Sequence, residues 1–174
     1  MISNQKSKIM DYRIILLLFS FVVFMGYYLY VFFTIGPLES ISDSYYHIKD
    51  HTGAEWPFSV AMSLTAIPIM VVGVEINALY FLSPAALIFV AFAPEFKSRR
   101  LEEKVHRWAS ILSVFFSIVG GIFITSSLLM SLIIVAEIGC IIYFLYDGSR
   151  FTAIRDAELS AYIGTFLILL IHLL

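Results

Sequence analysis

Charged residues are scarce in this chain: they make up 14% of its 174 residues, whereas soluble globular proteins carry about 25%. Hydrophobic residues make up 60% of the chain, and the mean hydropathy is +0.92. Its sixteen Phe and ten Tyr suit the aromatic belts that membrane proteins place at the two lipid–water interfaces. This composition excludes a soluble globular domain and indicates an integral membrane protein.

Net charge and cysteine are also nearly absent. A formal net charge of −2 gives no basic surface of the kind that binds nucleic acid, so nucleic acid is not an expected partner. The single cysteine, Cys140, lies in an apolar run, so there is no disulfide framework and the redox compartment stays open.

Six apolar runs account for most of the chain. The first is longer than the core of a signal peptide, about 7–15 residues, so we interpret it as an uncleaved spanning helix. The 41 residues from Val105 to Leu145 exceed the ~20 needed for one crossing, so we expect a tight turn near Ser126 to divide them. The sequence predicts an all-α polytopic membrane protein, a single domain over 1–174 with six transmembrane helices in one bundle, at about 14–35, 57–74, 78–94, 106–125, 127–146 and 157–174.

An even number of spanning helices determines which loops share a side of the membrane. The polar intervals 37–56, 95–107 and 147–156 lie on one side, and the termini and two tight turns lie on the other. Eight Lys and Arg on the loop side, against three near the N-terminus, favour loops in the cytosol, whereas the charges that flank the first helix argue the reverse. The orientation and the identity of the membrane therefore stay open.

The polar residues of the first loop are the main candidates for a functional site. If this loop is helical, Glu39, Asp43, His47 and His51 share one face, and Gly53 ends the helix. Because the three polar loops share one side of the membrane, the first residues of the fourth and sixth helices lie near this face. We predict a polar pocket at the level of the lipid headgroups, which binds or handles membrane lipids and is formed by Ser42, Asp43, His47, His51, His106 and Glu158.

Two other functions stay open at this point, and with them whether the protein is an enzyme. His47, His51 and His106 are enough for a catalytic zinc site with one open position, which predicts a metal-dependent membrane hydrolase. The motif HIKDH lacks the glutamate of HExxH, so we assign no catalytic residue, metal or cofactor. The third hypothesis is a structural or partner-binding membrane protein.

Two further features lie within the predicted helices. Glu137 is near the middle of the fifth helix, where an ionisable group is costly and marks a functional site by default; a hydrogen bond to a serine of the fourth helix explains it equally well. Small residues recur at four-residue steps in the fourth and sixth helices, which permits close helix packing in lipid and also a homo-oligomer. These residues are Ala109, Ser113, Ser117, Gly121 and Thr125, followed by Ala157, Ala161 and Thr165.

Short motifs also occur in a fixed order along the chain. They are Pro37, Ile41-Ser42-Asp43, Gly53, Glu55, Val105-His106 and Glu158. In this order the chain resembles the DRAM-type family, the damage-regulated autophagy modulators and related factors of phosphatidylinositol and GPI-lipid handling. The resemblance implies a six-span fold, both termini in the cytosol and a lipid-linked role.

Overall fold

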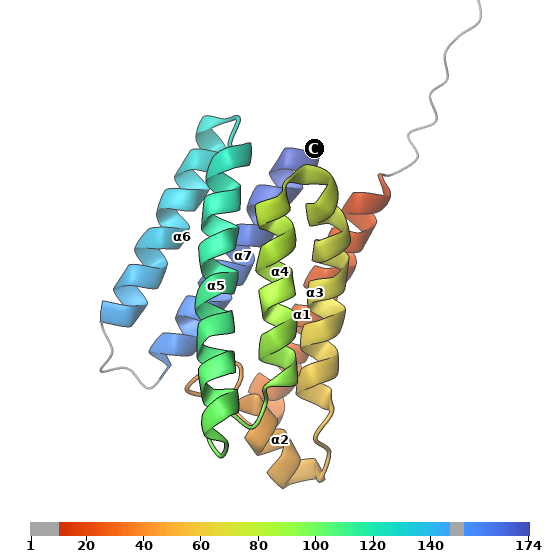
Figure 1. Ribbon diagram of the computed structural model, residues 1–174, viewed down its shortest axis with the longest axis vertical. Coiled ribbons are helices and arrows are strands. Elements are labelled where there is room, and N and C mark those ends of the chain that lie inside the picture. Colours follow the sequence, from red (N-terminus) through yellow and green to blue (C-terminus); the bar gives the residue numbers. More distant parts are fainter. Residues whose placement is uncertain (1–10, 147–151) are drawn as a thin grey trace, which may run out of the picture.

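The computed structural model describes residues 11–146 and 152–174, and it confirms the all-helical prediction. In Figure 1 the long helices run along the long axis of the molecule, and a short helix lies at one end. In chain order they are α1 (Tyr12–Thr34), α2 (Ser44–Thr52), α3 (Pro57–Ile76), α4 (Ala78–Phe92), α5 (Arg100–Ile124), α6 (Leu128–Tyr146) and α7 (Ala153–Leu173). Part of the third predicted loop, residues 147–151, lies outside the described residues, as do residues 1–10.

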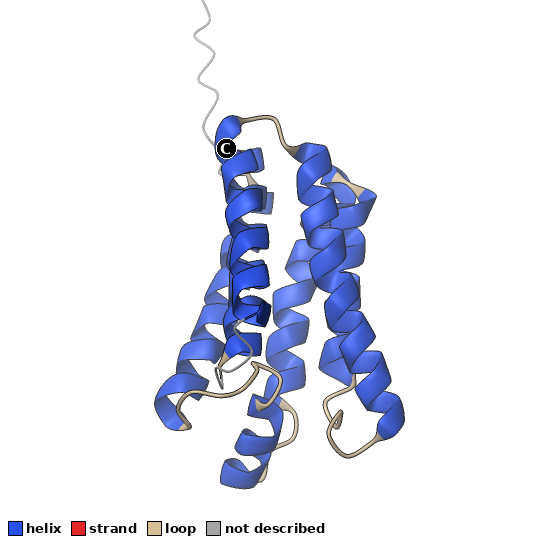
Figure 2. Ribbon diagram, turned by 90° about the vertical axis from the view of Figure 1, so that its left-hand side faces the viewer, coloured by secondary structure: helices blue, strands red, loops and turns tan. Residues whose placement is uncertain are grey.

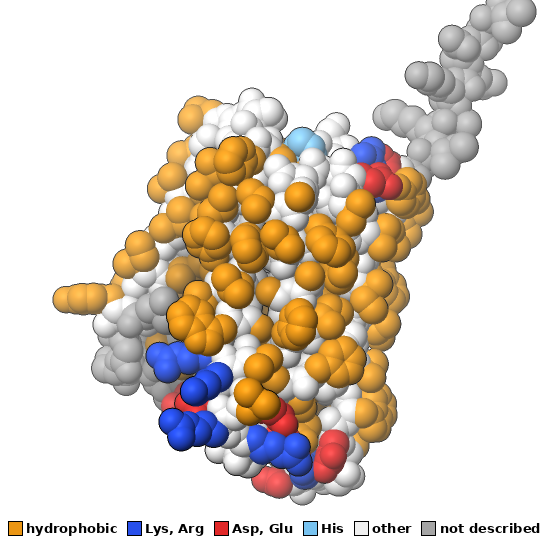
Figure 3. Space-filling view, in the orientation of Figure 1, with side chains coloured by type: hydrophobic (Ala, Val, Ile, Leu, Met, Phe, Trp, Pro, Cys, Tyr) orange, Lys and Arg blue, Asp and Glu red, His pale blue; other side chains and the backbone are white. Residues whose placement is uncertain are grey.

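Among the described residues, four helices are long and apolar enough to cross a membrane by length and composition: α1, α3, α5 and α7. Two further apolar helices, α4 and residues 128–144 of α6, are shorter. Large apolar side chains such as Phe33, Phe89 and Phe123 are exposed along the sides of the bundle. Figure 3 shows apolar side chains over the long face, most of the visible charged ones at the α2 end and a few at the opposite end. Such a surface is consistent with a multi-pass membrane protein, because soluble monomers rarely expose large contiguous apolar patches.

The described loops lie together as predicted. Figure 2 shows the longer connecting segments at the α2 end, and in Figure 1 the start of α1 and the end of α7 lie at the opposite end. Two contacts link three loops: the Lys97 amide donates to the Tyr46 hydroxyl at 2.7 Å, and the Arg155 amide donates to the Glu39 carbonyl at 3.1 Å.

The first loop differs from the ladder of four residues that the sequence suggested. The helix begins only at Ser44, so Glu39 precedes it and Asp43 is its N-cap residue. The reason is a contact from another helix: the amide of Ile41 donates to Glu158 of α7 at 2.7 Å, which holds this stretch outside a helix. Gly53 ends α2 as expected, with a φ of 73° that favours glycine.

Two other helices start earlier than expected. α5 begins at Arg100 rather than 106, with Glu102 and Glu103 in its first turn, where acidic side chains favour a helix. α7 begins at Ala153 rather than 157 and has Asp156 in its first turn.

Small residues bring the helices close together. A Cβ on Gly73 of α3 would lie 2.7 Å from the backbone of Tyr80 in α4, so the α3–α4 pair needs glycine there. The Tyr80 ring lies in turn against Gly120 and Gly121 of α5. The hydroxyls of Ser117 and Thr165 join α5 to α7 by a hydrogen bond. Many of the predicted small residues are therefore buried within this chain: Ala109, Ser117, Gly121, Ala157, Ala161 and Thr165.

Candidate functional site

The site is built on the segment between α1 and α2, which folds inward across the end of the bundle. Gly36, with a φ of 103°, lets the chain turn after α1. The segment is held by the Glu158 carboxylate of α7, which accepts the Ile41 amide at 2.7 Å. Ile41, Ser42 and Asp43 are all buried as a result.

Ser42 and His106 form a hydrogen-bonded pair at the centre of this end. Ser42 Oγ lies 3.0 Å from Nε2 of His106, and Nδ1 of the same ring lies 3.1 Å from the backbone oxygen of Ala93. A carbonyl oxygen only accepts, so Nδ1 carries the proton and Nε2 presents its lone pair to the Ser42 hydroxyl. The Phe96 ring stacks on the imidazole, with centroids 4.3 Å apart and an angle of 21°. Two contacts besides Ser42 thus hold a buried imidazole in one orientation.

Asp43 and Lys97 make the ion pair next to this histidine. Lys97 Nζ lies 2.7 Å from the Asp43 carboxylate, which is only 5% exposed, while the lysine side chain is 50% exposed. The hydrogen bond to Asp43 raises the pKa of Lys97 above its usual value. A second carboxylate, that of Glu39, lies 3.8 Å from the same ammonium.

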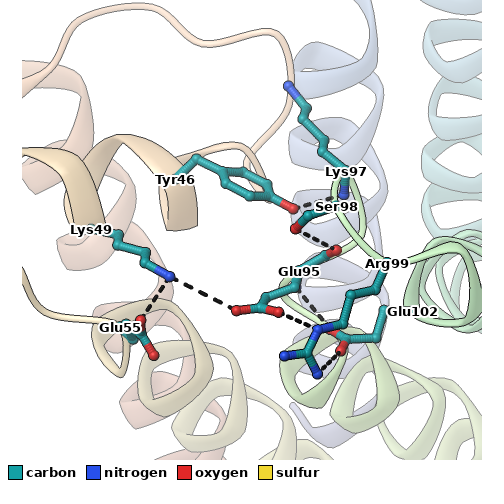
Figure 4. A network of polar contacts seen from close by, with 8 residues as sticks. All are labelled: Tyr46, Lys49, Glu55, Glu95, Lys97, Ser98, Arg99 and Glu102. Carbon is teal, nitrogen blue, oxygen red and sulfur yellow. Dashed lines mark hydrogen bonds and ion pairs between the residues drawn. The ribbon is translucent and has the colours of Figure 1, made fainter.

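A wider network ties α2 to the loop between α4 and α5 (Figure 4). Glu95 is its centre: its carboxylate pairs with Arg99 at 2.6 Å and lies 3.8 Å from Lys49 of α2. Lys49 also pairs with Glu55 at 2.7 Å. Exposed pairs of this kind contribute about 0–1 kcal/mol each, so the network orients α2 rather than stabilising the fold strongly.

A cavity of about 110 Å³ lies inside the bundle behind Ser42. It is lined by residues of α1, α3, α4, α5, α7 and the segment before α2. Its lining is mostly apolar, and Ser42 and Glu158 both take part in it. The other polar side chains of the lining are Ser83, Ser110, Ser113, Ser117, Tyr162 and Thr165.

Four of the six predicted pocket residues come together. Ser42 and His106 are in contact, Asp43 follows Ser42, and Glu158 binds the amide before it. His47 and His51 do not join them, since both are exposed on α2. In the described parts of the chain, no three His, Cys, Asp or Glu side chains are arranged to hold a metal ion. The zinc site therefore stays a prediction without a converging set of ligands.

Glu137 is buried as expected, at 4% exposure, but its neighbour differs from the prediction. Its carboxylate lies against Gly164 of α7, where a Cβ would be 2.5 Å from the carboxyl carbon. Neither of its oxygens accepts a hydrogen bond from the residues that the structure describes, so the expected bond to a serine of α5 is not found. Cys140, one turn further on, is exposed on α6.

Several contributors to the site could not be found in the sequence. The Ala93 carbonyl and the Phe96 ring orient His106, but an alanine and a phenylalanine in an apolar chain carry no signal. Lys97 is one of several bases in a charged loop, and nothing in the sequence distinguishes it from its neighbours. The serines of α5 did have a signal, their regular spacing, which we interpreted as packing alone.

Comparison with known proteins gives no match among family models, curated proteins or solved structures. The resemblance to the DRAM-type family therefore stays a prediction.

Proposed function

We propose that this chain is a six-span membrane protein that binds a membrane lipid, with part of an acyl chain in the cavity and the polar end of the lipid near Ser42 and Glu158. The cavity carries this proposal, because its lining joins apolar side chains from five helices to two polar residues at the loop end. Ligand sites in general are concave and mostly apolar, with a few polar groups that orient the ligand.

The path of the chain supports six crossings. In Figure 1, α3 and α5 both run from the α2 end to the opposite end, so the chain between them has to return, and α4 is the segment that returns. The same holds for α6 between α5 and α7. With 15 residues, α4 is about 22 Å long, shorter than the ~30 Å hydrocarbon core. It packs against both α3 and α5 over its length.

The size of the cavity limits what enters it. An engineered cavity of roughly 150 Å³ accepts benzene, so about 110 Å³ holds a few carbon atoms rather than a whole lipid. The rest of the ligand has to lie outside the cavity. A lipid meets this requirement, because most of its length stays in the bilayer.

We expect lipid headgroups at the polar end of the cavity, because charged side chains gather there. Ser42 lies just before α2, and Glu158 binds the amide of Ile41, so both belong to the same end as α2 and the charged network of Figure 4. The resemblance to the DRAM-type family points to a lipid-linked role as well, and it implies cytosolic termini.

Lipid retention after purification tests the proposal. Ser113 lines the cavity, so Ser113→Phe fills it, while the adjacent Leu112 is exposed on the outer face and makes Leu112→Phe a matched control. We expect native mass spectrometry to show bound lipid on the unmodified protein and on Leu112→Phe, and its loss on Ser113→Phe. Equal amounts of lipid on both variants, with unchanged thermal unfolding, would show that the cavity does not bind the lipid and would favour a structural or partner-binding role.

A further inference from the structure

We infer that Ser42 is a nucleophile and His106 its general base, and that the pair transfers the acyl group of an ester lipid held in the cavity. The inference rests on the proposed lipid binding and adds a reaction to it. Its basis is a buried serine–histidine pair of which the serine faces the cavity.

The geometry of the pair suits proton transfer. A nucleophile and its base have to lie within about 2.6–3.2 Å, and Ser42 Oγ is 3.0 Å from Nε2 of His106. The base also needs a third group that fixes its tautomer. The Ala93 carbonyl does this by accepting the proton of Nδ1, which leaves Nε2 free to take the proton of the serine.

The histidine ring is also fixed in position. Phe96 stacks on one face, and the residue is only 7% exposed. A ring held this way needs little reorganisation when the proton moves, which is the general advantage of a preorganised site.

Access distinguishes Ser42 from His106. Ser42 lines the cavity, whereas His106 lies behind it and is not part of the lining. A carbonyl carbon that enters from the cavity therefore meets the hydroxyl first, with the base on the far side of the attacking oxygen. Glu158 lines the same end, with one oxygen bonded to the Ile41 amide.

The other cavity serines that the structure describes have different partners. Ser83 donates to the Ser113 carbonyl at 2.8 Å, and Ser110 donates to the His106 carbonyl at 2.9 Å. Ser117 shares its hydrogen bond with the hydroxyl of Thr165. None of these arrangements provides a base. The two ring nitrogens of His106 contact Ala93 and Ser42, so Ser113 does not share this base either, and the chemistry is assigned to Ser42.

The reaction has two balanced steps. Ser42 Oγ attacks the ester carbonyl carbon as its proton passes to Nε2; the ester C–O bond breaks, and Nε2 returns the proton to the departing alkoxide. The products are an alcohol and an acyl ester on Ser42. Water or a second lipid alcohol then attacks the acyl carbon as its proton passes to Nε2. The bond between the acyl carbon and Ser42 Oγ breaks, Nε2 returns the proton to Ser42 Oγ, and the acyl group leaves as the free acid or a new ester. No oxidant, reductant or metal is needed.

A lipid-soluble fluorophosphonate tests the inference on the full chain in lipid nanodiscs, since such a probe bonds covalently to an activated serine. We expect peptide mass spectrometry to find the adduct on Ser42, and little or none on Ser83 or Ser113. This comparison is made within the unmodified protein, so it depends on no variant. An adduct spread evenly over the cavity serines, or missing from Ser42, would overturn the inference.

Two variants then test whether His106 acts as a base or only holds the loop in place. In His106→Gln the amide can still donate to Ala93 and accept from Ser42, but it cannot act as a base. We expect its thermal unfolding to stay close to that of the unmodified protein while labelling of Ser42 slows by about 10²- to 10⁴-fold. His47→Gln, the same change at an exposed histidine of α2, is the control and should label at the original rate. Unchanged labelling in His106→Gln would show that the hydrogen bond only holds the loop.

The failure of this inference can be told apart from that of lipid binding. Lipid retention is measured on the unmodified protein and on Ser113→Phe, and labelling is measured separately on Ser42. If Ser42 is not labelled but lipid is retained and is lost in Ser113→Phe, lipid binding stands and the reaction is excluded. If Ser42 is labelled rapidly but no lipid is retained, the pair is reactive and the lipid proposal is wrong.

Discussion

Ser42 Oγ lies 3.0 Å from Nε2 of His106, although 64 positions separate the two residues in the chain. The contact joins the first loop to the head of α5, and Glu158 joins the same loop to the head of α7. One short segment thus closes the end of a bundle whose interior contains a cavity. Stability and function are expected to depend on the same few contacts here.

Glu158 is the first of these contacts to test. Glu158→Ala leaves the Ile41 amide without its acceptor, which should lower the free energy of unfolding by about 1–3 kcal/mol. Glu158→Gln keeps a carbonyl oxygen at this place and should be closer to the unmodified protein. Thermal or denaturant unfolding in mild detergent measures the difference. Equal destabilisation by both variants would show that the amide bond is not what holds the loop.

Gly164 is expected to be essential for the α6–α7 contact. A Cβ there would lie 2.5 Å from the carboxyl carbon of Glu137 and 2.8 Å from its Cγ, so Gly164→Ala should destabilise the protein by about 1–3 kcal/mol. Gly139 of α6 is the matched control, because a Cβ there meets nothing within 4 Å. Gly139→Ala should be neutral or stabilising by up to about 1 kcal/mol, since alanine favours helices. The two variants are compared by thermal unfolding, and a similar effect of both would contradict the packing seen at Gly164.

Replacing Glu137 itself should stabilise the fold. Its buried oxygens accept no hydrogen bond from the described residues, and an apolar side chain of similar shape removes the cost of burying them. Glu137→Met is therefore expected to raise the free energy of unfolding by about 1 kcal/mol. Should Glu137→Met instead lower both stability and function, Glu137 would have a role in this membrane protein that its contacts do not reveal.

The Asp43–Lys97 pair predicts a dependence of stability on high pH. A lysine whose pKa is raised on folding stabilises the fold fully below the pKa of the unfolded chain, and it loses that contribution as pH rises through the folded value. Because Asp43 raises the pKa of Lys97 above 10.5, the stability lost in Lys97→Met should be constant from pH 7 to about 10 and disappear at higher pH. The half-exposed lysine limits the effect to about 1 kcal/mol. Lys104→Met, at an exposed lysine of α5, is the control and should show no such change.

The helices could be predicted because their signal is local. Long apolar runs, divided by shorter polar segments, indicate α1 and α3 to α7, and Gly53 indicates the end of α2. Helix starts were less predictable: the charged turns before His106 and Glu158 are helical although they resemble loops. The ladder from Glu39 to His51 was wrong at its first residue because a carboxylate from another helix binds the backbone between them.

For the site, the sequence predicts which residues lie at the same end of the bundle, but not the contacts between them. Counting helices brings the heads of α5 and α7 to the first loop, and this is why Ser42, Asp43, His106 and Glu158 could be grouped in advance. Which nitrogen of His106 faces Ser42 depends on the Ala93 carbonyl, and the exposure of His47 and His51 depends on how α2 lies. The cavity depends on side chains from five helices at once, which no spacing in one segment reveals.

The central claim, that an acyl chain occupies the cavity, is tested most directly by cross-linking. A phospholipid with a photoreactive diazirine in one acyl chain is incorporated into nanodiscs with the full chain, and the adducts are located by peptide mass spectrometry. We predict adducts on Leu87 and Val114, which line the cavity, and their loss in Ser113→Phe. Adducts confined to outward-facing residues such as Phe89 and Phe115, and unchanged by Ser113→Phe, would contradict the account.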